Sequence, residues 1–147
     1  MYDGIIICGG QGNPKDNIQM IEICKNLLKS GKPVFAVGNA GLYLALAAGA
    51  DTFKLPFGHR GINHPCTEEG TSRCYITTQN HGYGIREGSL PAGWKTTFIN
   101  NNDNSIEGFC NESKPFSGVL FYPEGCPGSR DTEFLFDRFI RQIMETL

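Results

Sequence analysis

Short apolar runs alternate with helix-like segments in the first third of the chain. Residues 4–8 and 33–37 are apolar runs of strand length, and each is followed closely by glycine. Between them, Asn17 can cap a helix with a one-sided apolar face, and Gly31 can end it. Strands separated by helices are joined by crossover connections, which place the strands parallel in one sheet. The pattern therefore predicts an α/β fold.

The second half of the chain has a different pattern. A helix at residues 43–48 and a strand at 52–55 complete the first part. Short strand candidates separated by turn residues then occupy residues 73–78, 82–85, 95–100, 106–110 and 118–122. Residues 132–147 form an amphipathic helix. Together these elements predict one domain over residues 1–147, with a mixed, mostly parallel α/β sheet and helices on both faces.

Charge and hydropathy exclude two classes of partner. The net charge is −2 and no basic run stands out, so we expect no nucleic-acid partner. The longest apolar stretch, Leu42 to Ala50, is far shorter than the roughly 20 residues that span a bilayer, so we expect no membrane segment. No basic segment follows Met1, which argues against a signal peptide. We expect a cytoplasmic protein, with the mitochondrial matrix as the other option.

Cysteine and histidine spacing does not predict a metal site. The six cysteines form no CxxC pair, so we expect free thiols in a reducing compartment. They are Cys8, Cys24, Cys66, Cys74, Cys110 and Cys126. His59 and His64 could bind a metal ion, but no third ligand with convincing spacing accompanies them. We therefore expect no metal and no cofactor, and a hydrogen-bonded loop at these histidines instead.

Two glycine-containing turns follow the first two strands. Residues 8–14 could bring backbone N–H groups close to an oxyanion, although they form neither a P-loop nor a G-x-G-x-x-G motif. The strand at 33–37 runs into Gly38, where α/β hydrolytic folds place a nucleophile on a strained turn before a helix. Glycine accepts such a turn but supplies no nucleophile.

Several longer segments match one family together. They are residues 31–35 with 44–50, residues 57–65, residues 78–83 with 90–94, residues 102–103 with 107–108, and residues 121–124 with 127–128 and 131–132. These segments extend over essentially the whole chain. In them, the chain resembles the glutaminase domain, or small subunit, of carbamoyl phosphate synthetase, a class I glutamine amidotransferase. The resemblance implies a flavodoxin-like fold that releases ammonia from glutamine for a large ATP-grasp synthetase partner. It also implies that a first strand–helix–strand is missing, so the domain is N-terminally incomplete.

The same resemblance shows where catalytic residues are replaced. The family's cysteine nucleophile aligns with Gly38, and its histidine base aligns with Tyr122. Glu124 is the one retained member of the triad, and Leu42 replaces a glutamine that helps to hold substrate. A thiolate activated by imidazole is needed for this chemistry, and tyrosine, with an ordinary pKa of about 10, is a poor base near neutral pH. We therefore expect no hydrolysis of glutamine.

The substrate-binding positions are better preserved. The resemblance assigns substrate contacts to Gly10, Gly12, Asn80, Gly82 and Tyr83. These residues could also persist only because they form turns. Glutamine is therefore a possible ligand, and we expect it to bind weakly.

Three functions stay open at this point. The first is a catalytically inactive glutaminase-like domain with a structural or allosteric role in an ammonia-using synthetase, because vertebrate synthetases of that kind resemble this chain in lacking the cysteine. The second is a free-standing pseudoenzyme that binds a small molecule. The third is an active glutaminase in which Cys8 or Cys126 acts with His81. Whether the domain is an enzyme, and whether it serves pyrimidine or arginine and urea synthesis, stays open.

Overall fold

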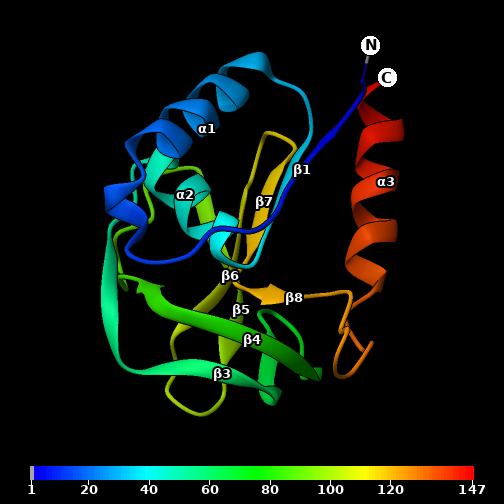
Figure 1. Cartoon of the computed structure of the whole chain (residues 1–147). Coiled ribbons are helices and arrows are strands. Elements are labelled where there is room, and N and C mark those ends of the chain that lie inside the picture. The colour runs from blue at the N-terminus through cyan, green and yellow to red at the C-terminus, as the bar shows by residue number, and fades with distance from the viewer. Residues whose placement is uncertain (1) are drawn as a thin grey trace.

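One mixed sheet of eight strands organises the computed structural model, which describes residues 2–147 (Figure 1). The strands are β1 (Ile5–Ile7), β2 (Val34–Val37), β3 (Thr52–Glu68), β4 (Cys74–Ile85), β5 (Trp94–Asn100), β6 (Ile106–Asn111), β7 (Phe116–Val119) and β8 (Phe121–Tyr122). The helices are α1 (Ile18–Ser30), α2 (Asn39–Ala48) and α3 (Phe134–Thr146), with a short 3-10 turn η1 at Pro14–Asp16. The strand order is β1-β2-β7-β6-β5-β3-β4-β8.

Parallel and antiparallel pairing divide the sheet into two parts. Strand β2 pairs in parallel with β1 and β7, as the crossover pattern predicts. The other pairings, from β7 through to β8, are antiparallel. The predicted mixed α/β class is confirmed, but the expectation of mostly parallel strands is not met. The difference arises because the second half of the chain folds as antiparallel strands, which need only short turns between neighbours.

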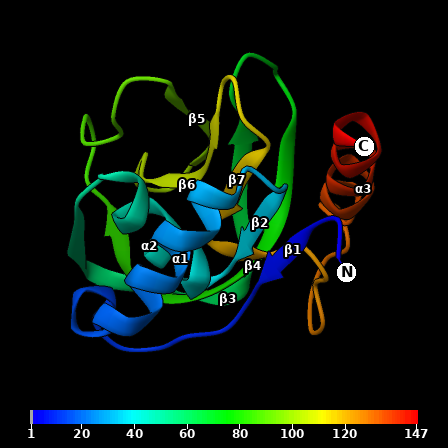
Figure 2. The ribbon, with the colours of Figure 1, turned by 90° about the horizontal axis from the view of Figure 1, so that it is seen from above.

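Helices cover both faces of the sheet, as expected (Figure 2). The four residues of β2 are all buried, and their side chains alternate between the two faces. Val34 and Ala36 pack in a core cluster with residues of α1 and α2, whereas Phe35 and Val37 pack in a second cluster with Leu135 and Phe139 of α3. This two-sided burial explains why the segment has an unbroken apolar sequence.

The helix ends agree with the sequence. The Asn17 side chain accepts a hydrogen bond from the Met20 backbone N–H at 3.2 Å and so caps α1. Gly31 and Gly49 end α1 and α2 in the left-handed conformation, in which glycine carries no steric penalty. Among residues 2–147, no helix is both long and apolar enough to cross a membrane.

Strand β3 is much longer than the sequence suggested. The expected strand covered residues 52–55, but β3 continues to Glu68 and pairs with β4, which joins the two expected strands at 73–78 and 82–85. The register shifts between Lys54 and His59 and again between Gly61 and His64. Prolines and glycines in this stretch suggested a loop, and these irregularities accommodate them within the strand.

Candidate functional site

The turn between β2 and α2 has the backbone of a nucleophile elbow. Gly38 adopts φ 65° and ψ −137°, a backbone conformation that residues other than glycine rarely adopt. Its backbone N–H donates to the Phe121 carbonyl oxygen at 3.3 Å, which ties the turn to β8. Helix α2 begins at the next residue, Asn39. The strand, turn and helix are therefore arranged as in hydrolytic α/β folds, with no side chain at the apex.

Tyr122 fills the space that a nucleophile would need. A Cβ atom built on Gly38 would lie 2.5 Å from Cε1 and 2.8 Å from the hydroxyl oxygen of Tyr122. Tyr122 comes from β8 and pairs with Thr78 of β4, so the sheet holds its backbone in place. A cysteine at position 38 could enter only if the tyrosine ring moved.

The Tyr122 hydroxyl is also unsuited to act as a base. Burial raises its pKa above the ordinary value of a tyrosine, and Glu124 adds to the rise, against a hydrogen bond with the Asn39 backbone that lowers the pKa. The phenol is therefore neutral near neutral pH. In nucleophile elbows, the backbone N–H that follows the nucleophile stabilises the oxyanion. Here that position is Asn39, and its backbone already interacts with Tyr122.

Glu124 has no imidazole to orient. It is exposed in the turn that follows β8, where the Gly125 backbone N–H donates to the Tyr122 carbonyl oxygen at 3.1 Å. Within residues 2–147, the Glu124 carboxylate takes part in no side-chain hydrogen bond or ion pair. Orienting the base is the function of the third member of such a triad, so the retained carboxylate lacks its partner.

The predicted substrate contacts lie around one pocket of about 280 Å³. Gly10, Gly12, Asn80, Gly82 and Tyr83 all line it, together with Tyr122. The sequence did not assign three other lining residues, Gln11, Asn39 and Arg60. The Asn39 amide donates to the Gly10 carbonyl oxygen at 2.7 Å, which fastens the glycine loop to the elbow. The structure thus brings the five predicted residues together, and their binding of substrate stays a prediction.

Leu42 does not face this pocket. Its side chain is only 1% exposed and packs in the core cluster beside α1. Leu42 therefore contributes no polar group to the pocket. The resemblance could not show this, because burial of a helix residue depends on which elements pack against that helix.

A family model for class-I glutamine amidotransferases matches residues 1–142. The chain belongs to this family. Multifunctional protein pyr-3 of Neurospora crassa is 48% identical over 143 residues, which make up 97% of this chain and 8% of that protein. The mitochondrial carbamoyl-phosphate synthase (ammonia) of Homo sapiens is 45% identical over 144 residues, 97% of this chain and 10% of that protein. The resemblance to carbamoyl phosphate synthetase is confirmed, and the chain spans a tenth or less of these relatives.

Solved structures support the amidotransferase fold. A protein from Thermoplasma acidophilum described as a GMP synthase A subunit superposes with a TM-score of 0.80 at 18% identity, over 98% of this chain and 74% of that chain. A glutamine amidotransferase from Thermotoga maritima gives a TM-score of 0.70 at 16% identity, over 99% of this chain and 65% of that chain. At these identities the likeness concerns the fold alone.

The cysteines that could replace the nucleophile of this amidotransferase domain are not paired with a histidine. Cys8 and Cys126 are exposed, whereas the His81 side chain is buried. His81 Nδ1 lies 2.8 Å from the Tyr83 carbonyl oxygen, and Nε2 lies 3.1 Å from Gln79 Oε1. In the part of the chain that the structure describes, these contacts engage both ring nitrogens, so His81 is not placed to activate a thiol.

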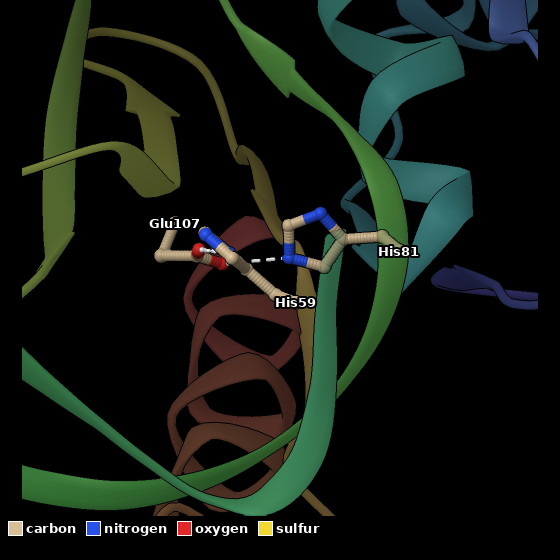
Figure 3. A group of neighbouring side chains, drawn as sticks. All are labelled: His59, His81 and Glu107. Carbon is tan, nitrogen blue, oxygen red and sulfur yellow. Dashed lines mark hydrogen bonds and ion pairs between the residues drawn. The ribbon is translucent and has the colours of Figure 1, made fainter. Parts of the chain in front are cut away.

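A second polar group lies beneath the pocket of the amidotransferase domain, between strands β3, β4 and β6 (Figure 3). It consists of His59, His81 and Glu107, which we call the buried triad of residues. His59 Nδ1 lies 2.7 Å from Glu107 Oε1, and His81 Nε2 lies 3.3 Å from Glu107 Oε2. On its other side, His59 Nε2 lies 2.7 Å from Asp103 Oδ2.

The electrostatics of the buried triad depend on these contacts. Burial alone would raise the pKa of Glu107, but the hydrogen bond with His59 and the nearby His81 imidazole lower it below its ordinary value. Burial alone would lower the pKa of His59, but Glu107 and Asp103 raise it to about 9. Glu107 is therefore an ionised carboxylate with no exposed surface, stabilised by neighbouring imidazoles. The sequence placed Glu107 in a segment that matches the family but did not link it to His59 and His81; the antiparallel sheet brings the three together.

Proposed function

We propose that this amidotransferase domain belongs to a carbamoyl phosphate synthetase and is catalytically inactive toward glutamine. The observation that carries the proposal is the position of the Tyr122 ring, which occupies the volume that a side chain at Gly38 would need. A thiolate and an imidazole are both required for this hydrolysis, and loss of one member of such a unit removes most of the rate enhancement. Both are absent from the elbow.

Its role is then structural or allosteric, exerted on the synthetase. The family's large ATP-grasp portion is the proposed partner, in agreement with relatives in which this domain is one small segment. One relative's name gives ammonia as the nitrogen source, which shows that a similar domain occurs in an ammonia-type synthetase. We propose that this protein also takes free ammonia. Its compartment, cytoplasm or mitochondrial matrix, and its pathway follow those of the synthetase.

The test is glutamate release from glutamine by the purified protein, with and without the synthetase portion. We expect no release above a control without protein, while ammonia supports carbamoyl phosphate formation. The matched control is a synthetase whose glutaminase domain has the complete triad, assayed in parallel. Release of glutamate that disappears in Cys8→Ser or Cys126→Ser would instead establish an active glutaminase with a relocated nucleophile.

Binding of another small molecule is the second candidate. The pocket of about 280 Å³ remains, and its lining includes Arg60, Asn80 and Tyr122. Arg60 lies in the matched segment of residues 57–65, and its guanidinium would favour a ligand with a carboxylate. Soaking crystals with glutamine and with small dicarboxylates distinguishes this candidate, because only a ligand-binding domain would show density beside Arg60.

A further inference from the structure

The side chains of the buried triad direct hydrogen-bond acceptor atoms toward one another. The Tyr83 carbonyl oxygen can only accept a hydrogen bond, so His81 Nδ1, at 2.8 Å, must carry the proton. In neutral His81 the other nitrogen, Nε2, then presents a lone pair toward Gln79 Oε1 at 3.1 Å and Glu107 Oε2 at 3.3 Å. Facing lone pairs repel each other, and either a proton on Nε2 or a metal ion between these atoms removes the repulsion.

His59 is fixed in a matching way from the opposite side. Its Nε2 lies 2.7 Å from Asp103 Oδ2. The Ser105 backbone N–H and hydroxyl donate to Asp103 Oδ1 at 3.0 and 2.7 Å, which orients the carboxylate so that Oδ2 can accept the proton on His59 Nε2. Nδ1 of His59 therefore faces Glu107 (Figure 3). Imidazoles that bind metals characteristically donate their outer N–H to a carboxylate or a backbone carbonyl, and His59 and His81 have one acceptor of each kind.

Glu107 supplies an independent observation. Its side chain has no exposed surface, and its Oε2 atom has no hydrogen-bond partner within residues 2–147. In the described structure, its ion pairs are to His59 and His81 alone, without lysine or arginine. A buried carboxylate oxygen without a hydrogen-bond partner is costly, so Glu107 Oε2 is free to take a further ligand. Its unpartnered oxygen points toward His81, into the space that the two imidazoles enclose.

We propose that His59 Nδ1, His81 Nε2 and Glu107 bind a divalent transition-metal ion of the zinc class. The three ligand atoms lie within 4.8 Å of one another. Ligand atoms of a tetrahedral zinc ion lie roughly 3.3 Å apart, given metal–ligand bonds of about 2.0–2.1 Å. Small rotations of the two rings would close the difference. Two imidazoles and a carboxylate are a known zinc ligand set, and the ion takes the place of protons that otherwise lie between these atoms.

The site has a route to solvent. A pocket of about 520 Å³ is lined by His59, His64 and Asp103, and the Asp103 side chain is 41% exposed. The metal can therefore enter past Asp103, and a water molecule can complete the coordination from this side. The ion would serve the fold of the β3–β4–β6 region, independently of whether the domain hydrolyses glutamine. The sequence predicted no metal site because it did not identify Glu107 as a third ligand.

The direct test uses the unaltered protein, freed of metal with a chelator and titrated with Zn²⁺ alone. Long-range ¹H–¹⁵N spectra of the histidine rings report which nitrogen binds the ion. We expect saturation at one ion per chain, with His59 bound through Nδ1 and His81 through Nε2. Absence of binding, or binding through other nitrogens, would overturn the proposal.

Variants provide a second, separate readout. His81→Gln should weaken Zn²⁺ binding by about 100-fold or more, because it removes a ligand. Asp103→Asn, at an exposed residue that supports His59, should weaken it by about 10–100-fold while the protein stays folded. His64→Gln is the matched control, since this neighbouring histidine is outside the ligand set, and it should leave the dissociation constant unchanged. Unchanged affinity in Asp103→Asn and His81→Gln, with loss of binding when exposed thiols are blocked, would assign the ion to cysteines and refute the site.

Discussion

The elbow at Gly38 and the buried triad lie close together, yet they differ in what they contain. The elbow has the backbone of a catalytic turn and lacks the chemistry, since Tyr122 occupies the reacting position. The buried triad has side chains that can bind a metal ion or a proton, but none of them is part of the elbow. His81 connects the two regions, because it lines the pocket beside the elbow and contacts Glu107. A solvent-facing site can exchange its side chains with little change in stability, whereas a fully buried carboxylate depends on its partners.

The largest effect is expected from breaking the buried triad. Glu107→Ala should lower the free energy of unfolding by about 3–5 kcal/mol, because it leaves the His59 charge buried without one of its two carboxylates. Urea denaturation measures the change. Glu145→Ala, at an exposed position of α3, is the matched control and should change stability by less than about 0.5 kcal/mol. If Glu107→Ala lowered the free energy of unfolding no more than Glu145→Ala does, the buried triad would not depend on its partners and would not differ from the elbow in this respect.

A pair of glycine substitutions tests how tightly Tyr122 fills the elbow. Gly12 and Gly38 both have positive φ, but a Cβ at Gly12 would meet nothing within 4 Å. Gly38→Ala should therefore destabilise the protein by about 1–3 kcal/mol more than Gly12→Ala, because it adds a clash with the ring to the backbone strain. Removing the ring with Tyr122→Ala should abolish the extra loss. Equal losses in the two single variants, measured by thermal unfolding, would mean that the ring moves freely.

The sequence predicted local features better than distant ones. The caps at Asn17 and Gly31 depend on neighbouring residues, so they could be found from the chain alone. Strand β3 was missed because prolines and glycines interrupt its pattern, and its irregular pairing with β4 is set by the sheet. The identity of Tyr122 was predicted to end catalysis, but its occupation of the nucleophile space needed the fold. The contact of Glu107 with His59 was missed because the two residues lie 48 positions apart, on different strands.

The smallest effect concerns ligand binding by the pocket. Gly10, Gly12 and the Asn80–Tyr83 segment still line the pocket. The cysteine and histidine that Gly38 and Tyr122 replace can no longer contribute contacts to bound glutamine. We expect glutamine to bind with a dissociation constant of roughly 1 mM or weaker, which corresponds to a favourable binding free energy of about 4 kcal/mol or less. Calorimetric titration measures it. A low-micromolar dissociation constant would favour a glutamine-sensing domain over a purely structural one.

Covalent trapping tests the central claim most directly. A diazoketone analogue of glutamine alkylates an activated cysteine at a glutaminase site, and intact-mass analysis detects the adduct. We predict no adduct, because Gly38 has no thiol and Tyr122 occupies its space, whereas iodoacetamide should label the exposed Cys8, Cys74 and Cys126 of the same sample. A stoichiometric adduct on one cysteine, prevented by excess glutamine, would contradict the account and identify a working nucleophile.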